Sequence, residues 1–87
     1  MSTPEKIRQK LAVLAPEHLE VVDDSSQHAG HAGAAAGGGH YRLLIISEQF
    51  KGQPTQARHR MVYQALGNLM QREIHALSIK AYTSAEV

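Results

Sequence analysis

Six histidines and no cysteine decide what chemistry this chain can offer. His28, His31 and His40 lie in or beside a stretch of alanine and glycine, and His75 lies near the end of the sequence. Neutral imidazole is a common metal ligand, whereas a thiolate site or a thiol nucleophile cannot be built without cysteine. We therefore expect any bound metal to be held by histidine, by carboxylate or by ligands that a partner supplies.

Each of these histidines is either a structural residue or a metal ligand, and the sequence allows both interpretations. His75 begins a predicted strand just after a helix, so it is either a half-buried residue bonded to loop carbonyls or a ligand with one ring nitrogen facing outward. His28 and His31 are either solubilising residues of a low-complexity loop or ligands, and such loops also bind zinc, nickel or copper adventitiously. His40 borders the next strand and is a weaker candidate.

Arg58-His59-Arg60 forms a basic cluster where a helix is predicted to begin. It is either a solvated helix start, a partner-docking patch, or part of a nucleic-acid surface together with Lys51 and Lys80. Cations at a helix N-terminus oppose the macrodipole by a few tenths of a kcal/mol, which favours a functional explanation. The net charge of +1 does not by itself indicate nucleic-acid binding.

The first half of the chain predicts a helix and two strands. Thr3 can cap a helix that has Pro4 in its first turn and ends before Pro16. Residues 19–22 are short and rich in β-branched side chains, which is typical of a strand. Residues 27–40 consist mainly of alanine, glycine and histidine and predict a flexible loop. Residues 41–47 contain an unbroken apolar run that predicts a central strand.

The second half predicts a helix and a third strand after the turn at residues 50–52. One helical face carries Ala57, Met61, Ala65, Leu66, Leu69 and Met70, although residues 55–60 alternatively form a separate short helix. From His75 onward, apolar residues alternate with polar ones, so His75, Leu77, Ile79 and Ala81 are expected to face inward. A right-handed crossover then places the last strand parallel to the second.

A single domain over residues 1–87 is the expectation for a chain of this length. The predicted fold is α+β, in the order α-β-β-α-(α)-β, with a three-stranded mixed sheet and helices on one face. No apolar run is long enough to span a bilayer or to serve as a secretory signal, so we expect a cytoplasmic protein that does not bind membranes. The sequence has no nucleophile and base at a recognisable spacing, so we do not expect an enzyme.

Several segments together resemble the BolA family signature. They are Phe50-Lys51-Gly52, Arg58-His59-Arg60-Met61-Val62-Tyr63 and Ile74-His75-Ala76-Leu77, preceded by Leu19-Glu20-Val21-Val22-Asp23-Asp24-Ser25 and His28. The resemblance covers nearly the whole chain and implies a small fold like the class II KH domain. The Gly-x-x-Gly loop with which KH domains grip single strands is absent, because Gly52-Gln53-Pro54-Thr55 keeps only its first glycine.

The resemblance implies an adaptor that shares a [2Fe-2S] cluster with a monothiol glutaredoxin of the Cys-Gly-Phe-Ser type. His75 matches the family's ligand in the His-Ala-Leu segment, and His28 best matches the loop ligand, with His31 as a substitute. The glutaredoxin cysteine and a bound glutathione would supply the thiolates. Such a protein acts in cluster trafficking, maturation or iron sensing, and alone it is expected to be a monomer or a weak homodimer.

The resemblance also carries an alternative function, because some BolA proteins are described as transcriptional regulators. In that case the KH-like helix-turn region and the basic residues Lys51, Arg58, His59, Arg60 and Lys80 would contact DNA. Binding would be weak at physiological salt, because these few basic residues neutralise only a handful of phosphates.

Overall fold

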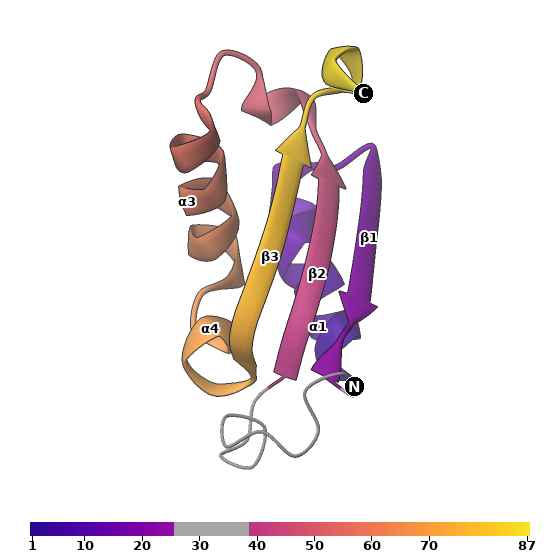
Figure 1. The fold of residues 1–87 in the computed structure, drawn as a ribbon, viewed down its shortest axis with the longest axis vertical. Helices are drawn as coiled ribbons and strands as arrows, with labels where there is room; N and C mark the ends of the chain where they lie inside the picture. Colours follow the sequence, from indigo (N-terminus) through magenta and orange to yellow (C-terminus); the bar gives the residue numbers. More distant parts are fainter. Residues whose placement is uncertain (26–38) are drawn as a thin grey trace.

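The computed structural model describes residues 1–25 and 39–87 (Figure 1). The helices and strands within these ranges are α1 (Thr3–Leu11), β1 (His18–Asp23), β2 (Gly39–Ile46), α3 (Thr55–Leu66), α4 (Leu69–Arg72) and β3 (Ile74–Tyr82). Short 3-10 helices lie at Ala12–Leu14, Glu48–Phe50 and Ser84–Glu86. The order of elements is the one that the sequence predicts.

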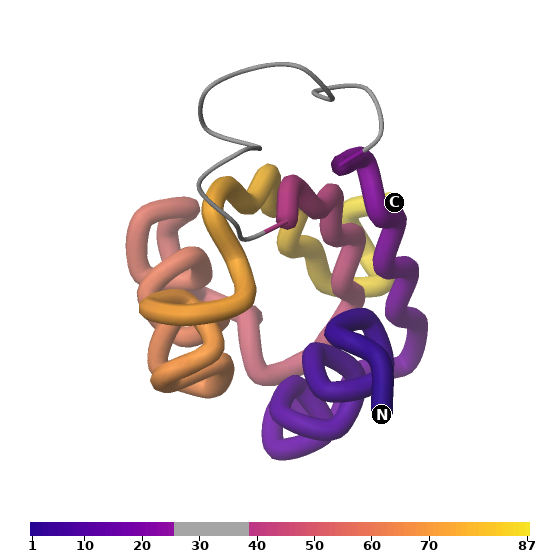
Figure 2. Tube along the Cα trace, turned by 90° about the horizontal axis from the view of Figure 1, so that it is seen from below, coloured from indigo at the N-terminus to yellow at the C-terminus, as the bar shows by residue number. Residues whose placement is uncertain are grey.

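The three strands form one mixed sheet in the order β1-β2-β3. β1 pairs with β2 antiparallel, and β3 pairs with β2 parallel, as a right-handed crossover through α3 and α4 requires. Seen along the strands, α1 lies on the same side of the sheet as α3 and α4 (Figure 2). This confirms the predicted α+β arrangement, which is compatible with a KH-like order.

Helix α1 begins one residue earlier than predicted. Ser2, and not Thr3, is the N-cap: its hydroxyl accepts a hydrogen bond from the Glu5 N–H, while the Glu5 carboxylate accepts one from the Ser2 N–H. This capping box satisfies amides that the first turn leaves without partners. The helix gives way to a 3-10 turn whose C-cap, Ala15, has a left-handed φ of 48°, directly before Pro16.

The long helical segment divides at Gly67 and not after Arg60. Gly67 has a φ of 57° and ends α3, and its N–H donates to the Tyr63 carbonyl. A positive φ disfavours any residue with a Cβ, so glycine is the natural residue at this helix end. The buried face of α3 also differs by one residue from the expectation, since Arg58, Val62 and Leu66 are its buried residues.

The core lies between the helices and the inner face of the sheet. Buried apolar side chains come from every layer: Ile7, Leu11, Leu14, Tyr41, Leu43, Ile45, Phe50, Val62, Leu66, Leu69, Ile74 and Ala81. Burial of this kind is the main source of stability in so short a chain. Within the described residues, the structure contains no helix that is long and apolar enough to span a membrane.

Candidate metal-binding site

The candidate site lies at an irregularity in strand pairing at the beginning of β3. Gly39 pairs with Ile74, but the next residue of β2, His40, pairs with Ala76, so His75 is an extra residue in the ladder. Such a β-bulge re-aims a side chain. It explains why the inward row starts at Ile74, which is 3% exposed, while His75 is exposed. The expectation that His75 faces inward is therefore wrong.

The bulge places the His75 ring beside the His40 ring. Their centroids are 5.1 Å apart and the ring planes are tilted by 47°. A metal such as zinc lies about 2.1 Å from an imidazole nitrogen, so two imidazoles on one tetrahedral metal have centroids roughly 5 Å apart. The separation of the two rings thus fits shared metal ligation, and His75 lies at the surface where a partner can reach it.

Three hydrogen bonds to two other segments fix the backbone around His40. Its N–H donates to the Ser25 hydroxyl at 3.0 Å, and its carbonyl accepts from the Asp24 N–H at 2.7 Å. The preceding Gly39 N–H donates to the Glu73 carbonyl at 2.9 Å, which ties the start of β2 to the residue before β3. The base of one ring is therefore held rigidly, which preorganises the pair.

The Asp23-Asp24-Ser25 segment forms the other side of this end of the sheet. Ser25 donates its N–H to the Asp23 carboxylate at 2.9 Å, and hydrogen bonding from the Ser25 side chain and backbone lowers the pKa of Asp23. The Asp24 carboxylate lies 3.6 Å from Arg42 Nε. These carboxylates serve the turn and the sheet, which is the role that their turn-forming sequence predicts.

Gly39 provides the close approach that the site needs. A Cβ at this position would overlap the ring of Tyr41, which is itself buried. The aromatic ring thus covers the strand glycine next to the bulge, an arrangement that helps to fix strand register. Packing of Tyr41 on Gly39 consequently supports the pairing in which His75 is expelled from the ladder.

The predicted loop ligands His28 and His31 lie outside the described residues. The segment that contains them connects Ser25 to Gly39, and these two residues belong to the same end of the sheet as His40 and His75. Among residues 1–25 and 39–87, no group of three or more histidine, cysteine or acidic side chains is arranged to hold a metal ion. The described part of the chain therefore offers a pair of imidazoles and no complete metal site.

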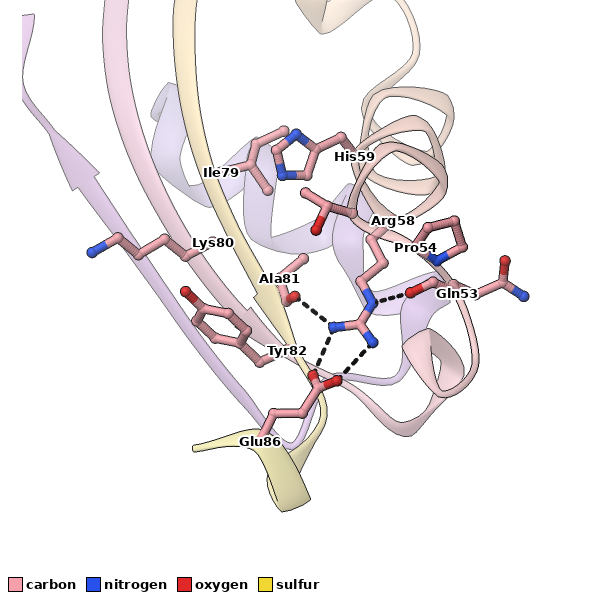
Figure 3. Close-up of a pocket in the computed structure, with 10 residues that line it drawn as sticks. Gln53, Pro54, Arg58, His59, Ile79, Lys80, Ala81, Tyr82 and Glu86 are labelled. Atoms are coloured by element: carbon pink, nitrogen blue, oxygen red, sulfur yellow. Dashed lines mark hydrogen bonds and ion pairs between the residues drawn. The ribbon is translucent and has the colours of Figure 1, made fainter.

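Arg58, predicted at a partner or nucleic-acid surface, is built into the fold instead. It is 9% exposed, and its guanidinium donates to the Gln53 carbonyl, the Ala81 carbonyl and both carboxylate oxygens of Glu86 (Figure 3). The two bonds to Glu86 measure 2.6 and 2.8 Å, and the guanidinium lies 6.0 Å from the centroid of the Phe50 ring. Arg58 thus joins the start of α3 to the end of β3 and to the C-terminal turn.

Glu86, in the last turn of the chain, is the carboxylate that pairs with the Arg58 guanidinium. Hydrogen bonds from Arg58 first, and then from the Thr83 N–H, lower the pKa of Glu86 to about 2. The same contact with Glu86 raises the pKa of Arg58. The pair borders a pocket of about 400 Å³ between the first turn of α3 and residues 79–82. Bidentate pairing of this kind is specific to arginine.

Of the other basic residues, His59 and Lys80 line the same pocket as Arg58, whereas Lys51 and Arg60 do not. Lys51 and Arg60 are exposed, and His59 is half-buried and lines the pocket together with Ile79. Lys80 points away from His59, across β3 to the face of the sheet that the helices leave open (Figure 3). A surface made of these four residues would therefore extend over two sides of the molecule.

Sequence reasoning missed two functional neighbours. His40 ranks as a weak candidate until the register of β2 and β3 is known, because only the bulge brings it to His75. A role for Glu86 could have been predicted from the sequence, because Thr83 and Glu86 have the spacing of a capping box, and the structure forms one there. Nothing in that motif indicates that Arg58 shares the carboxylate.

Comparison with known proteins identifies the fold and the motifs together. The model of the BolA-like protein family matches residues 11–86. The chain is 37% identical to the DNA-binding transcriptional regulator BolA of Escherichia coli K12 over 87 residues, covering 99% of this chain and 80% of that protein. It superposes on the structure of BolA1 from Arabidopsis thaliana with a TM-score of 0.85 and 36% identity, covering 100% and 97% of the two chains.

A further relative shows the same domain within a longer protein. SufE-like protein 1 of Arabidopsis thaliana, described as chloroplastic and mitochondrial, is 44% identical over 88 residues. The match covers 94% of this chain but 24% of that relative. The chain therefore spans about a quarter of SufE-like protein 1, and only that part of the relative is comparable.

Proposed function

Because this chain belongs to the BolA family, we propose that it is a non-catalytic adaptor that shares a [2Fe-2S] cluster with a monothiol glutaredoxin. The observation that carries this proposal is the His40–His75 pair at one end of the sheet, with centroids 5.1 Å apart. Two imidazoles on one iron are a known ligation mode of [2Fe-2S] centres, as in Rieske proteins. His75, which is exposed, is the first ligand of the proposal.

The second ligand comes from His28, His31 or His40. His40 already lies beside His75. His28 follows Ser25 by three residues, and three residues of extended chain span at most about 11 Å. Ser25 is hydrogen-bonded to His40, so the chain from Ser25 to His28 is short enough for His28 to reach the same end of the sheet. The variants below separate these three histidines.

The other iron needs thiolates, and this chain has no cysteine. Iron–sulfur clusters favour thiolate ligands, so a partner must bring them. A glutaredoxin cysteine together with the thiolate of a bound glutathione completes the set of four ligands. When bound, the cluster supplies its redox and transfer chemistry, while this chain contributes imidazoles that orient it and a surface that the next recipient meets.

Reconstitution with a partner tests the proposal. The chain is mixed with a monothiol glutaredoxin, glutathione, iron and sulfide, and the visible circular dichroism is compared with that of the glutaredoxin alone. We expect a heterodimer with a distinct spectrum, because imidazole replaces thiolate on one iron. His75→Ala is expected to remove the difference. An unchanged spectrum on adding the wild-type chain would overturn the proposal.

Histidine variants assign the second ligand. His28→Ala, His31→Ala and His40→Ala are each compared with His18→Ala, since the His18 ring lies on β1 in a hydrogen bond with Glu20 and serves as a matched control. Only the variant that removes a ligand should reproduce the His75→Ala spectrum. If the three candidate variants all behave like the wild type, no single one of these histidines is required as the second ligand.

DNA-dependent regulation is the second candidate function. It is supported by the name of the Escherichia coli relative, a DNA-binding transcriptional regulator, and by the exposed Lys51 and Arg60 near the start of α3. In this proposal those side chains contact phosphates, while Arg58 holds the helix in place. The salt dependence described in the Discussion tests it.

A further inference from the structure

The face of the sheet opposite the helices is open in the described part of the chain. Helices α1, α3 and α4 all lie on the inner side (Figure 2). Strand alternation and register assign the following residues to this outer face: His18, Glu20 and Val22 of β1, His40, Arg42, Leu44 and Ile46 of β2, and Ala76, Ser78, Lys80 and Tyr82 of β3.

The centre of the outer face is apolar. Leu44 and Ile46 follow each other along the middle strand and are half-buried. Val22 and Tyr82, on the two edge strands, are 41% and 36% exposed. A shallow pocket of about 220 Å³ lies beside Leu44. Exposed apolar groups that cluster on a surface with a polar rim are typical of an interaction site.

The charges on this face are arranged about Leu44. The register aligns Glu20 of β1, Leu44 of β2 and Lys80 of β3 in one row across the sheet. Opposite charges therefore flank an apolar residue at equal distances, about 4.8 Å per strand. Lys80 forms no ion pair with the residues that the structure describes, whereas one carboxylate oxygen of Glu20 contacts His18.

We propose that the outer face binds a second copy of this chain about a twofold axis parallel to β2. This axis places Leu44 on the partner's Leu44, and β1 opposite the partner's β3. Each Glu20 then faces the partner's Lys80, so the row is self-complementary. The proposal does not rest on the cluster-sharing function, although His40 lies on the same face.

The row of Glu20, Leu44 and Lys80 selects this axis over the other possible one. A twofold axis across the strands would also stack the two faces, but it would place Glu20 opposite the partner's Glu20 and Lys80 opposite the partner's Lys80. Like charges that face each other are destabilising. The parallel axis is also compatible with the small angle at which aligned sheets pack.

The expected affinity is low. Strand spacing and rise give a face of roughly 14 by 26 Å, which is below the area of standard stable interfaces. The same axis brings Arg42 towards the partner's Arg42, although each is drawn to its own Asp24, 3.6 Å away. We therefore expect a dissociation constant on the order of 0.1–1 mM, which is typical of transient association.

Charge reversal tests the proposal by sedimentation equilibrium and by NMR on the intact chain, from about 20 μM to about 2 mM. The wild type should show reversible dimerisation, with shift changes on dilution at Leu44 and Ile46. Glu20→Lys and Lys80→Glu should each weaken dimerisation at least fivefold, and the double variant should restore it. Lys10→Glu on α1 makes the same charge change as Lys80→Glu, on an exposed helical position, and should have no effect.

Three outcomes would overturn the proposal. The first is a wild-type chain that stays monomeric at about 2 mM. The second is a double variant that associates no better than the single variants, because the recovery follows only from Glu20 facing Lys80. The third is an equal loss of association in Lys10→Glu, which would indicate a nonspecific charge effect. Far-UV circular dichroism on every variant confirms that each one folds.

Discussion

The imidazole of His75 lies beside that of His40 because His75 is the one residue that β3 carries in excess over β2. Without the bulge, a strict alternation would turn this side chain towards the helices, next to the core. The bulge instead leaves Ile74 to fill the core and presents His75 at the surface. The proposed ligand pair thus depends on strand register.

This proximity is testable without any partner. Replacing His75 with alanine removes a ring 5.1 Å from that of His40, so the His40 ring resonances should shift in NMR spectra of the chain alone. His18→Ala removes a histidine of another strand and should leave those resonances in place. Equal effects of the two variants would mean that the rings are not neighbours in solution.

The packing of Tyr41 on Gly39 predicts a sensitive position. Gly39→Ala places a methyl group inside the buried ring of Tyr41, and overpacking of this kind typically costs about 1–3 kcal/mol of unfolding free energy. Urea denaturation measures the loss, and the His75 resonances should move because the register beside the bulge changes.

A matched glycine and a double variant complete this test. Gly52→Ala introduces a methyl group into open space at a φ of 78°, so it should cost only the left-handed strain, about 1 kcal/mol, without moving His75. Combining Gly39→Ala with Tyr41→Val should cost less than the sum of the two single changes, because the clash is gone. Strict additivity would contradict the contact.

The Arg58–Glu86 pair predicts an acid-sensitive contribution to stability. The pKa of Glu86 is lowered from an ordinary value of 4.5 to about 2, so the folded state binds a proton less readily than the unfolded state. The contribution is therefore complete above about pH 4.5 and is lost as the pH falls towards 2. Chemical denaturation across this range should show a steeper loss for the wild type than for Glu86→Gln.

Glu17→Gln is the control for this pH dependence. Glu17 is exposed, and its side chain forms no hydrogen bond or ion pair with the described residues, so its variant should follow the wild type across the same range. Arg58→Lys should resemble Glu86→Gln in losing the bidentate contact. Parallel pH profiles for the wild type and Glu86→Gln would show that the ion pair does not stabilise the folded chain.

DNA binding has its own signature. Each phosphate contact contributes about 0.9 to the slope of log affinity against log salt concentration, so Lys51→Ala and Arg60→Ala should each lower the magnitude of that slope by about 1. Fluorescence anisotropy with a labelled duplex measures it. Lys10→Ala, which removes one charge from an exposed position on α1, is the control, and affinity without salt dependence would exclude phosphate binding. Arg58→Ala is unsuitable because it removes a buried part of the fold.

Most of the fold was predictable because periodicity reports burial directly. The apolar run of β2 and the alternation after Ile74 follow from the sheet, and Pro4 and Pro16 mark the limits of the first helix. Prediction from local sequence fails where contacts between distant residues determine burial or strand register. Arg58 is charged yet buried, because Glu86, 28 residues away, compensates it. The bulge at His75 has no sequence signal, since it results from strand pairing.

The central claim is that histidine of this chain binds iron of a shared cluster, and pulsed EPR tests it most directly. The chain is labelled with ¹⁵N-histidine, assembled with an unlabelled glutaredoxin, and reduced. We expect the strong nitrogen couplings of the cluster to change from ¹⁴N to ¹⁵N, and one of them to disappear in His75→Ala. A spectrum without strongly coupled nitrogen, or one that labelling and His75→Ala leave unchanged, would contradict the account.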